Sequence, residues 1–215
     1  MLKIKHFSRS DLLRYVTNQL EHFFPDGQTK IRPALDACLD RTLNRLETCI
    51  NPVKMWQTGV FDHLHSSQYT IFLYFLANTL WKKEEDEKIC TKLFLLNKAL
   101  NSIDCFYEID MPEIFFIGHS LGIVLAKATY GNHLVLYQNS TVGKNRGTAP
   151  TIEDDVILYP NTAVIGTSHV RRGSVISQGC SIINTDTPGN CLVFQTDKGL
   201  VFRPRPEKTD FFFNK

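Results

Sequence analysis

The strongest constraint on the fold of this 215-residue chain is a period of six residues in its C-terminal half. Every sixth position from Ile152 onward is aliphatic: Leu158, Val164, Val170, Ile176 and Ile182. The fifth position of each hexad is small or β-branched: Val156, Thr162, Ser168, Ser174 and Cys180. Neither a helix nor a single strand repeats every six residues, but a parallel β-helix places one inward side chain on each face of a triangular coil. The period therefore predicts a parallel β-helix, whose stacked coils bury a continuous core. We expect this β-helix to be left-handed.

A second run with the same period precedes the first, and we expect it to point inward as well: Ile117, Ile123, Thr129, Val135 and Thr141. Thr141 and Ile152 are 11 residues apart, which corresponds to one hexad and five extra residues. The segment 143–148 is polar and contains two glycines. We therefore expect the extra residues to form a loop that projects from the coil.

The N-terminal half has the pattern of a helical region, with only Gly27 and Gly59 as glycines before residue 105. Apolar residues spaced by three and four predict a helix over 31–50, and further helices are expected over 67–83 and 86–101. The acidic segment 84–87 suits the start of the last helix, where the helix dipole favours negative charge. The predicted class is α+β, with an all-helical domain at 1–105, the β-helix at 106–190 and a tail at 191–215. Aromatic residues in that tail are expected to cover a neighbouring surface.

Composition excludes several classes of protein. The six cysteines contain no CxxC pair, so neither a zinc site nor a disulfide framework is expected, and no other metal site is predicted. No apolar run approaches the roughly 20 residues of a membrane span, and the first residues do not resemble a signal peptide, so we expect a cytoplasmic protein. The net charge of +2, with both signs mixed along the chain, does not indicate a nucleic-acid partner.

Three segments resemble motifs of one enzyme family. The segment 119–125, His-Ser-Leu-Gly-Ile-Val-Leu, is similar to that family's His-Ala-Thr-Gly-Ile-Val-Val. The segment 138–143, Gln-Asn-Ser-Thr-Val-Gly, is similar to its Gln-Ser-Val-Thr-Leu-Gly, and 149–156, Ala-Pro-Thr-Ile-Glu-Asp-Asp-Val, to its His-Pro-Lys-Ile-x-x-x-Val. The chain thus resembles the hexapeptide-repeat acyltransferases, and among them the serine acetyltransferases, over about residues 105 to 190.

The resemblance implies transfer of an acetyl group from acetyl-CoA to a hydroxyl, which in the family belongs to L-serine, in the first step of cysteine synthesis. His119 stands at the position of the family's catalytic histidine and would act as the base that takes the hydroxyl proton. In the family a carboxylate partner precedes that histidine by fifteen residues, and Asp104 has this spacing. Asp110 lies one hexad closer and in the same phase, so we expect Asp110 to be the partner, with Asp104 second and Glu113 third.

By the same resemblance, acetyl-CoA would bind in the groove between neighbouring β-helices, in a homotrimer that the helical half could double to a hexamer. Residues implied in this donor site lie in the loop and in the following coils: Gly143, Lys144, Tyr159, Pro160 and Gln178.

The chain departs from the family at positions that would hold the acceptor. The family's second histidine is replaced by Ala149, the acid before its catalytic histidine by Gly118, and a later glutamate by Lys127. Arg146 or Lys144 could supply one of the charged contacts that serine needs. Three functions therefore remain open: serine acetylation, acetylation of a sugar of a polysaccharide or nucleotide-sugar, or a noncatalytic assembly module. For the sugar, the candidate lining residues are Tyr130, Tyr137 and His133.

Overall fold

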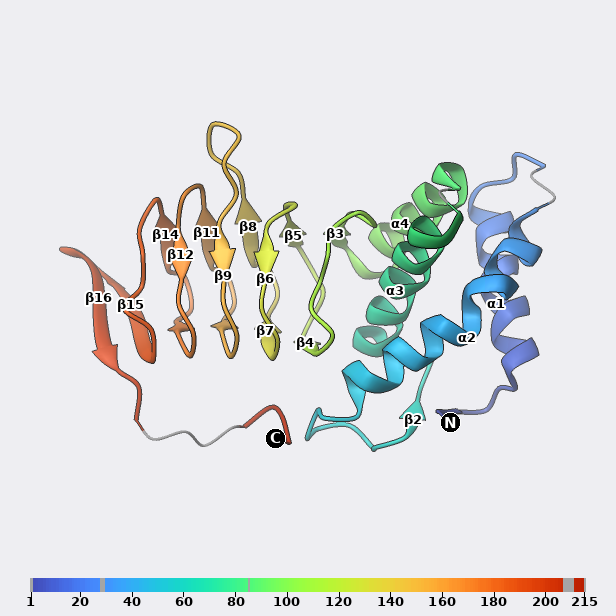
Figure 1. Cartoon of the computed structure of the whole chain (residues 1–215), viewed down its shortest axis with the longest axis horizontal. Helices are drawn as coiled ribbons and strands as arrows, with labels where there is room; N and C mark the ends of the chain where they lie inside the picture. The colour runs from blue at the N-terminus through green and yellow to red at the C-terminus, as the bar shows by residue number, and fades with distance from the viewer. Residues whose placement is uncertain (1, 28–29, 85, 207–210, 215) are drawn as a thin grey trace.

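The computed structural model describes residues 2–27, 30–84, 86–206 and 211–214, in which a helical region is followed by a parallel β-solenoid of about five turns. Figure 1 shows the helices gathered at one end and the coils stacked along the long axis. This arrangement confirms the predicted class of a helical half followed by a parallel β-helix. No helix in the described part of the chain combines the length and apolarity needed to cross a membrane.

The helical region holds α1 (Arg9–Phe23), α2 (Ile31–Ile50), α3 (Ser66–Glu84) and α4 (Glu87–Asn101), with the short parallel strands β1 (Lys3–Ile4) and β2 (Val60–Phe61) beside them. The bounds of α2 agree with the predicted helix, and those of α3 and α4 differ by one residue. Asp86 caps α4 by accepting a hydrogen bond from the backbone of Ile89, which explains why the acidic segment marks this helix start. The sequence pattern did not delimit α1, which begins with a capping box between Ser8 and Asp11.

The helices and the first coil share one hydrophobic core. The side chain of Phe75 in α3 packs edge-on against Phe115, with ring centroids 5.7 Å apart. Tyr74 donates its hydroxyl to the carbonyl of Ile109 at 2.5 Å, and Asn78 donates to the carbonyl of Tyr107 at 2.7 Å. The helical region therefore packs directly against the open end of the solenoid.

Three parallel sheets form the solenoid. The first sheet contains β3 (Ile103–Cys105), β5 (Ile123–Leu125), β8 (Thr141–Gly143), β11 (Ala163–Ile165) and β14 (Ser181–Ile183). The second contains β4 (Phe115–Ile117), β7 (Leu134–Leu136), β10 (Ile157–Leu158), β13 (Val175–Ile176), β15 (Cys191–Thr196) and the antiparallel β16 (Gly199–Pro204). The third contains β6 (Thr129–Tyr130), β9 (Thr151–Ile152) and β12 (His169–Val170). Strands β3 and β15 lie outside 106–190, so the sheets extend beyond the range expected from the hexads.

The hexads of the later coils have the predicted role. All six aliphatic positions from Ile152 to Ile182 are fully buried. Strand register aligns these positions in pairs between successive coils: Ile152 with Val170, Leu158 with Ile176, and Val164 with Ile182. One inward residue per face therefore stacks on its equivalent in the next coil.

In the earlier run of hexads, Ile117 aligns with an inward position and Ile123 is buried, but the positions after them were assigned the wrong phase. The residues that align with the inward positions of the later coils are Leu125, Tyr130, Leu136 and Val142. Thr129 is exposed, and Val135 is buried against the outside of the solenoid rather than within it. The phase changes because Ile117 and Leu125 are eight residues apart, whereas Leu125 and Tyr130 are five apart.

The predicted loop projects from the turn between β8 and β9, as Figure 1 shows. Val142 and Ile152 are ten residues apart and occupy consecutive inward positions, so the insertion contains four residues beyond a hexad rather than five. A short bridge between Asn145 and Thr148 closes its tip.

The C-terminal segment covers the outer face of the second sheet. Phe212 and Phe213 are buried there against outward side chains of successive strands, namely Phe116, Val135, Ile157 and Val175. The backbone of Lys54 donates to the carbonyl of Phe212 at 2.8 Å, and the backbone of Asn214 donates to Pro52 at 2.7 Å. The tail aromatics thus cover a surface of this same chain and attach it to the segment after α2.

Candidate active site

His119 lies in an extended turn between β4 and β5. Register aligns Ile117 with Leu136 and Leu125 with Val142, so the first turn spans eight residues where the next spans six. The two additional residues fall between Gly118 and Gly122. The side chain of His119 is consequently exposed at a corner of the solenoid, which we call the His119 corner; it comprises the turns 118–122, 137–140, 159–162 and 177–180.

Both halves of the molecule hold this turn in place. Gly118 donates its N–H to Leu136 at 2.8 Å, and its carbonyl accepts from the hydroxyl of Ser67, at the start of α3, at 3.3 Å. Gly122 has a φ of +70°, and a Cβ there would lie 2.2 Å from Oδ1 of Asn139. Only glycine fits this position, because the left-handed backbone and the close side chain both exclude a Cβ.

The His119 side chain is exposed and has no polar partner among the described residues. Within the described residues, neither of its ring nitrogens takes part in a hydrogen bond or ion pair. An exposed imidazole is the side chain best suited to proton transfer near neutral pH. The geometry therefore permits His119 to act as a base toward a hydroxyl bound at this corner.

The aromatic side chain nearest to His119 belongs to Tyr137, whose ring centroid lies 6.3 Å from the imidazole. Tyr137 also stacks on Tyr159 of the next coil, at 5.6 Å and an interplanar angle of 24°. Burial raises the pKa of Tyr137, and the neighbouring Tyr159 raises it further. The Tyr137 phenol can therefore act as a hydrogen-bond donor near neutral pH.

The two aspartates considered as partners of His119 both pair with lysines of the helical region. Asp104 bonds to Lys98 at 2.6 Å and Asp110 to Lys82 at 2.6 Å. Asp104 lies in β3, where register aligns it with Val124 of β5, the strand that follows the His119 turn. Asp110 lies in the irregular segment between β3 and β4, and its side chain is 74% exposed. Strand register thus places Asp104, and not Asp110, beside the strand that the His119 turn enters.

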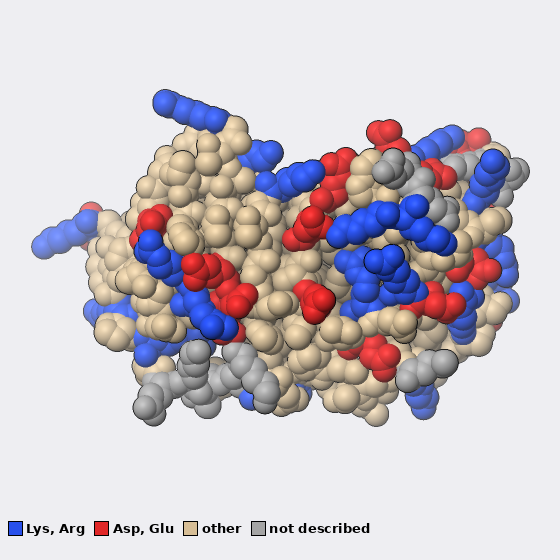
Figure 2. All heavy atoms as spheres, in the orientation of Figure 1, with Lys and Arg blue, Asp and Glu red and all other residues tan. Residues whose placement is uncertain are grey.

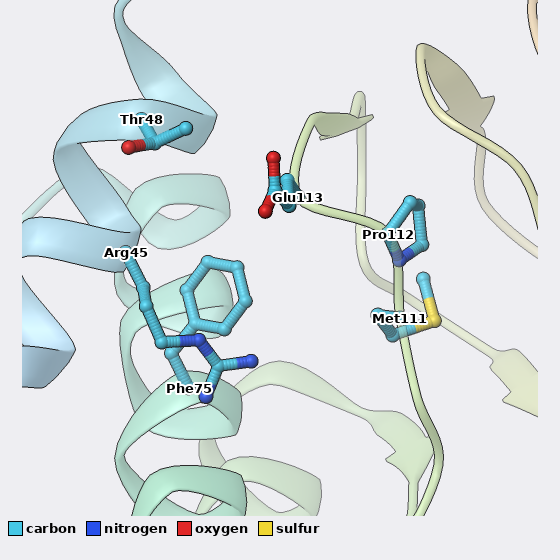
Figure 3. A pocket seen from close by; sticks show the side chains of 6 residues that line it. All are labelled: Arg45, Thr48, Phe75, Met111, Pro112 and Glu113. Atoms are coloured by element: carbon cyan, nitrogen blue, oxygen red, sulfur yellow. The ribbon is translucent and has the colours of Figure 1, made fainter.

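Glu113, the third carboxylate candidate, lines a separate pocket of about 110 Å³ between the helices and the first coil. Figure 3 shows its carboxylate facing α2, with Arg45 and Phe75 on the opposite wall. The guanidinium of Arg45 lies 4.4 Å from the ring centre of Phe75 and donates to Thr79 at 2.7 Å. This pocket does not include any residue of the His119 corner.

The predicted donor-site residues divide between two corners. Tyr159, Pro160 and Gln178 lie at the His119 corner, one and two coils beyond Tyr137. Gly143 ends β8, and Lys144 begins the loop at the next corner. Arg146 lies in the same loop, where it lines an open pocket of about 520 Å³ with Asn145, Thr148, Thr167 and Asn184. Figure 2 shows a basic side chain projecting from the loop tip.

Two of the proposed acceptor residues lie away from His119. Tyr130 occupies an inward position of the third sheet, and its hydroxyl donates to Ala126 at 2.6 Å. Burial raises its pKa strongly. His133 lies at the corner between the third and second sheets, with its ring 5.2 Å from Phe213 and Nδ1 3.4 Å from Asp155. The structure therefore brings only Tyr137 of this group to His119.

Charged residues form a network on the outside of the third sheet, where Figure 2 shows acidic and basic side chains interleaved. His169 bonds to Glu153 at 2.6 Å, and Arg172 approaches Asp154 and Asp155 at 3.3 Å each. These groups neutralise one another. No cluster of three or more potential metal ligands occurs among the described residues.

Sequence reasoning did not find the extended turn or the pairing of Tyr137 with Tyr159. The eight-residue spacing from Ile117 to Leu125 was a usable signal for the turn, because the inward positions flank an insertion. The two tyrosines each follow an inward leucine, Leu136 and Leu158, so the correct phase would have placed them at one corner.

Comparisons with known proteins give a consistent likeness. No protein-family model matches the chain. A serine acetyltransferase of Bacillus licheniformis is 30% identical over 136 residues, which cover 58% of this chain and 59% of that relative. The match thus spans about three fifths of the length of this curated relative.

Solved structures of serine acetyltransferases share the fold. The Brucella abortus enzyme in complex with coenzyme A matches with a TM-score of 0.72 and 15% identity, covering 95% of this chain and 85% of that one. The Neisseria gonorrhoeae enzyme in complex with serine matches with a TM-score of 0.67 and 14% identity, covering 93% of this chain and 85% of that one. The chain therefore resembles serine acetyltransferases in sequence over about three fifths of its length and in architecture over nearly its whole length.

Proposed function

We propose that this chain transfers an acetyl group from acetyl-CoA to a hydroxyl, with His119 as the general base. The observation that carries the proposal is the exposed, unbonded imidazole on a turn held by both halves of the molecule. Its support is the sequence likeness to a serine acetyltransferase and the shared architecture with an enzyme bound to coenzyme A.

In the proposed step, the acceptor oxygen attacks the carbonyl carbon of the thioester while His119 takes the hydroxyl proton. A carbon–oxygen bond forms, the tetrahedral intermediate collapses and the carbon–sulfur bond breaks. The departing sulfur receives the proton from the imidazolium, which yields the free thiol of coenzyme A and restores neutral His119. The proposed step involves no change of oxidation state and needs no metal ion.

A carboxylate beside the imidazole would hold its orientation and stabilise the imidazolium. We assign this role to Asp104, because its strand is the immediate neighbour of β5. Asp110, which the hexad argument favoured, is separated from that strand by the irregular segment and pairs with α3. Release of Asp104 from Lys98 would be needed for contact with His119, and their pair is exposed enough for this to cost about 1 kcal/mol or less.

The donor site is proposed to combine the His119 corner of one copy with the projecting loop of another. Tyr159, Pro160 and Gln178 would contact the pantetheine arm along the corner, while Gly143 and Lys144 would come from the neighbouring solenoid. This division explains why one chain does not bring the five residues together. It also requires an oligomer, and the homotrimer that the resemblance implies would satisfy this.

L-Serine is the first acceptor to test, because the related proteins carry that name. A sugar hydroxyl is the second, and the tyrosines beside His119 favour it. A noncatalytic assembly module is the alternative without chemistry.

The proposal is tested by calorimetric titration with acetyl-CoA, followed by thiol release from acetyl-CoA with and without added acceptors. We expect saturable binding of acetyl-CoA and acceptor-dependent release of free thiol. Absence of acetyl-CoA binding, together with no acceptor-dependent release, would identify the chain as the noncatalytic module.

A further inference from the structure

The ring of Tyr137 is fixed beside His119 by aromatic contacts on several sides. Besides stacking on Tyr159, it meets Phe116 edge-on at 6.3 Å and Phe212 edge-on at 6.2 Å, both at an interplanar angle of 69°. Phe212 is only 8% exposed and comes from the C-terminal segment, far away in sequence. Residues from three parts of the chain thus hold one half-buried ring next to the proposed base.

Gly118 provides the space that this ring occupies. A Cβ at position 118 would lie 2.6, 2.7 and 3.0 Å from Cε1, Cδ1 and Cζ of Tyr137. The backbone of Gly118 does not have the left-handed conformation that requires glycine, so the ring alone excludes a side chain here. The residue before His119 and the ring of Tyr137 therefore act as one structural unit.

The resulting wall beside His119 is uncharged and carries unused polar atoms. Its members are Phe116, Gly118, Tyr137, Tyr159 and Phe212. Among the described residues, neither tyrosine hydroxyl is bonded. The wall therefore combines apolar rings with two neutral phenol hydroxyls.

This chemistry discriminates between classes of acceptor. An amino acid carries an ammonium and a carboxylate, and placing either against uncharged rings costs free energy because no opposite charge replaces the lost water. A sugar ring carries C–H groups on its face and neutral hydroxyls at its edge. It can pack against an aromatic ring while its hydroxyls bond to phenol groups.

We infer that the acceptor is a hydroxyl of a neutral sugar ring that packs against Tyr137, with Gly118 making room for this ring. The inference rests on the proposed acetyltransfer and specifies its acceptor. Tyr137 then determines specificity, whereas His119 carries the proton.

The first arm of the test compares acceptors for the unmodified protein. The kcat/KM for thiol release from acetyl-CoA is measured with L-serine, L-homoserine, methyl glucopyranoside, N-acetylglucosamine and a uridine-diphosphate sugar. We expect at least one sugar to exceed L-serine by roughly 10-fold or more. The methyl glycoside and the nucleotide-linked sugar distinguish a free or polymer-borne sugar from a nucleotide-borne one. L-Serine as the best acceptor, or no acetylation of any sugar by protein that binds acetyl-CoA, overturns the inference but not the proposed function.

The second arm tests the wall itself. Tyr137→Ala should raise the KM of the best sugar by roughly 10-fold or more, and should raise the KM of acetyl-CoA by a smaller factor, because Tyr159 of the proposed donor site stacks on Tyr137. Tyr137→Phe should retain most of the affinity, because the ring remains. Gly118→Ala should raise the sugar KM by displacing the ring, and should have no added effect in the Tyr137→Ala background.

Phe202→Ala, on the exposed hairpin at the far end of the solenoid, is the matched aromatic control and should behave as the unmodified protein. Thermal unfolding of each variant identifies any that do not fold. An unchanged sugar KM in folded Tyr137→Ala, or additive effects of the two substitutions, would show that Tyr137 does not contact the acceptor. Loss of acetyl-CoA binding in the unmodified protein would instead reject the proposed function.

Discussion

At the scale of single residues, the structure supports a different carboxylate partner from the one that the hexads favoured, whereas His119 remains the proposed base. The motif singled out His119, and the two additional residues of the extended turn lie where its imidazole is exposed. Asp110 was favoured by hexad phase. That phase does not extend into the segment between β3 and β4, where the third sheet has no strand.

We predict that Asp104→Asn lowers kcat by roughly 10-fold or more, while Asp110→Asn changes it by less than about 3-fold. The reason is that an orienting carboxylate acts on the imidazole, whereas the Asp110 pair with Lys82 is exposed. Steady-state kinetics with saturating acetyl-CoA measure both effects. Lys98→Ala serves as the control for loss of the Asp104 ion pair and should leave kcat unchanged or raise it by up to about 5-fold, because Asp104 no longer has to be released. A larger effect of Asp110→Asn would restore the hexad argument.

At the scale of elements, the C-terminal segment connects stability with the site. Phe212 is 8% exposed and touches both Phe116 and Tyr137, whereas its neighbour Phe211 is 69% exposed. Phe212→Ala should lower the free energy of unfolding by about 2 to 4 kcal/mol. Phe211→Ala should change it by less than about 0.5 kcal/mol. Chemical denaturation of both variants measures the difference, and equal effects would mean that the tail does not pack on the sheet.

Elements that follow from a pattern within a short stretch of sequence could be predicted. Features that depend on contacts between distant residues could not. The bounds of α2 follow from one apolar stripe, and the late coils from an unbroken hexad, so both were predicted. The phase of the first coils was not, since the extended turn shifts every inward position after Ile117. The tail contact depends on Val135, Ile157 and Val175 meeting Phe212 across a long separation in sequence, which no local pattern reports.

At the scale of the whole molecule, the first sheet and the turn before β5 carry exposed apolar side chains on the outside of the solenoid. Leu121 is 61% exposed, Val124 44% and Ile183 52%, and register places the latter two in that sheet. Burying these side chains in an interface between copies of the chain would be favourable. We expect a trimer through residues 106–190, and a hexamer where the helical regions also pair.

Light scattering at micromolar concentration measures the number of copies in the assembly. Ile183→Glu should shift the trimer toward monomer, because a charge would replace an apolar side chain at the interface. Phe202→Glu, on the β16 hairpin, is the control and should leave the trimer intact. A fully active monomer of the unmodified protein would refute both the interface and a donor site shared between copies.

The most direct test of the central claim is the turnover of His119→Ala compared with that of His169→Ala. Both remove a solenoid histidine, but His169 bonds to Glu153 in the surface network and has no place at the His119 corner. With acetyl-CoA and the best acceptor, His119→Ala should lower kcat by roughly 100-fold or more, the scale expected for loss of a general base. His169→Ala should retain kcat within about 2-fold, and both variants should bind acetyl-CoA. Nearly unchanged turnover in folded His119→Ala would contradict the account.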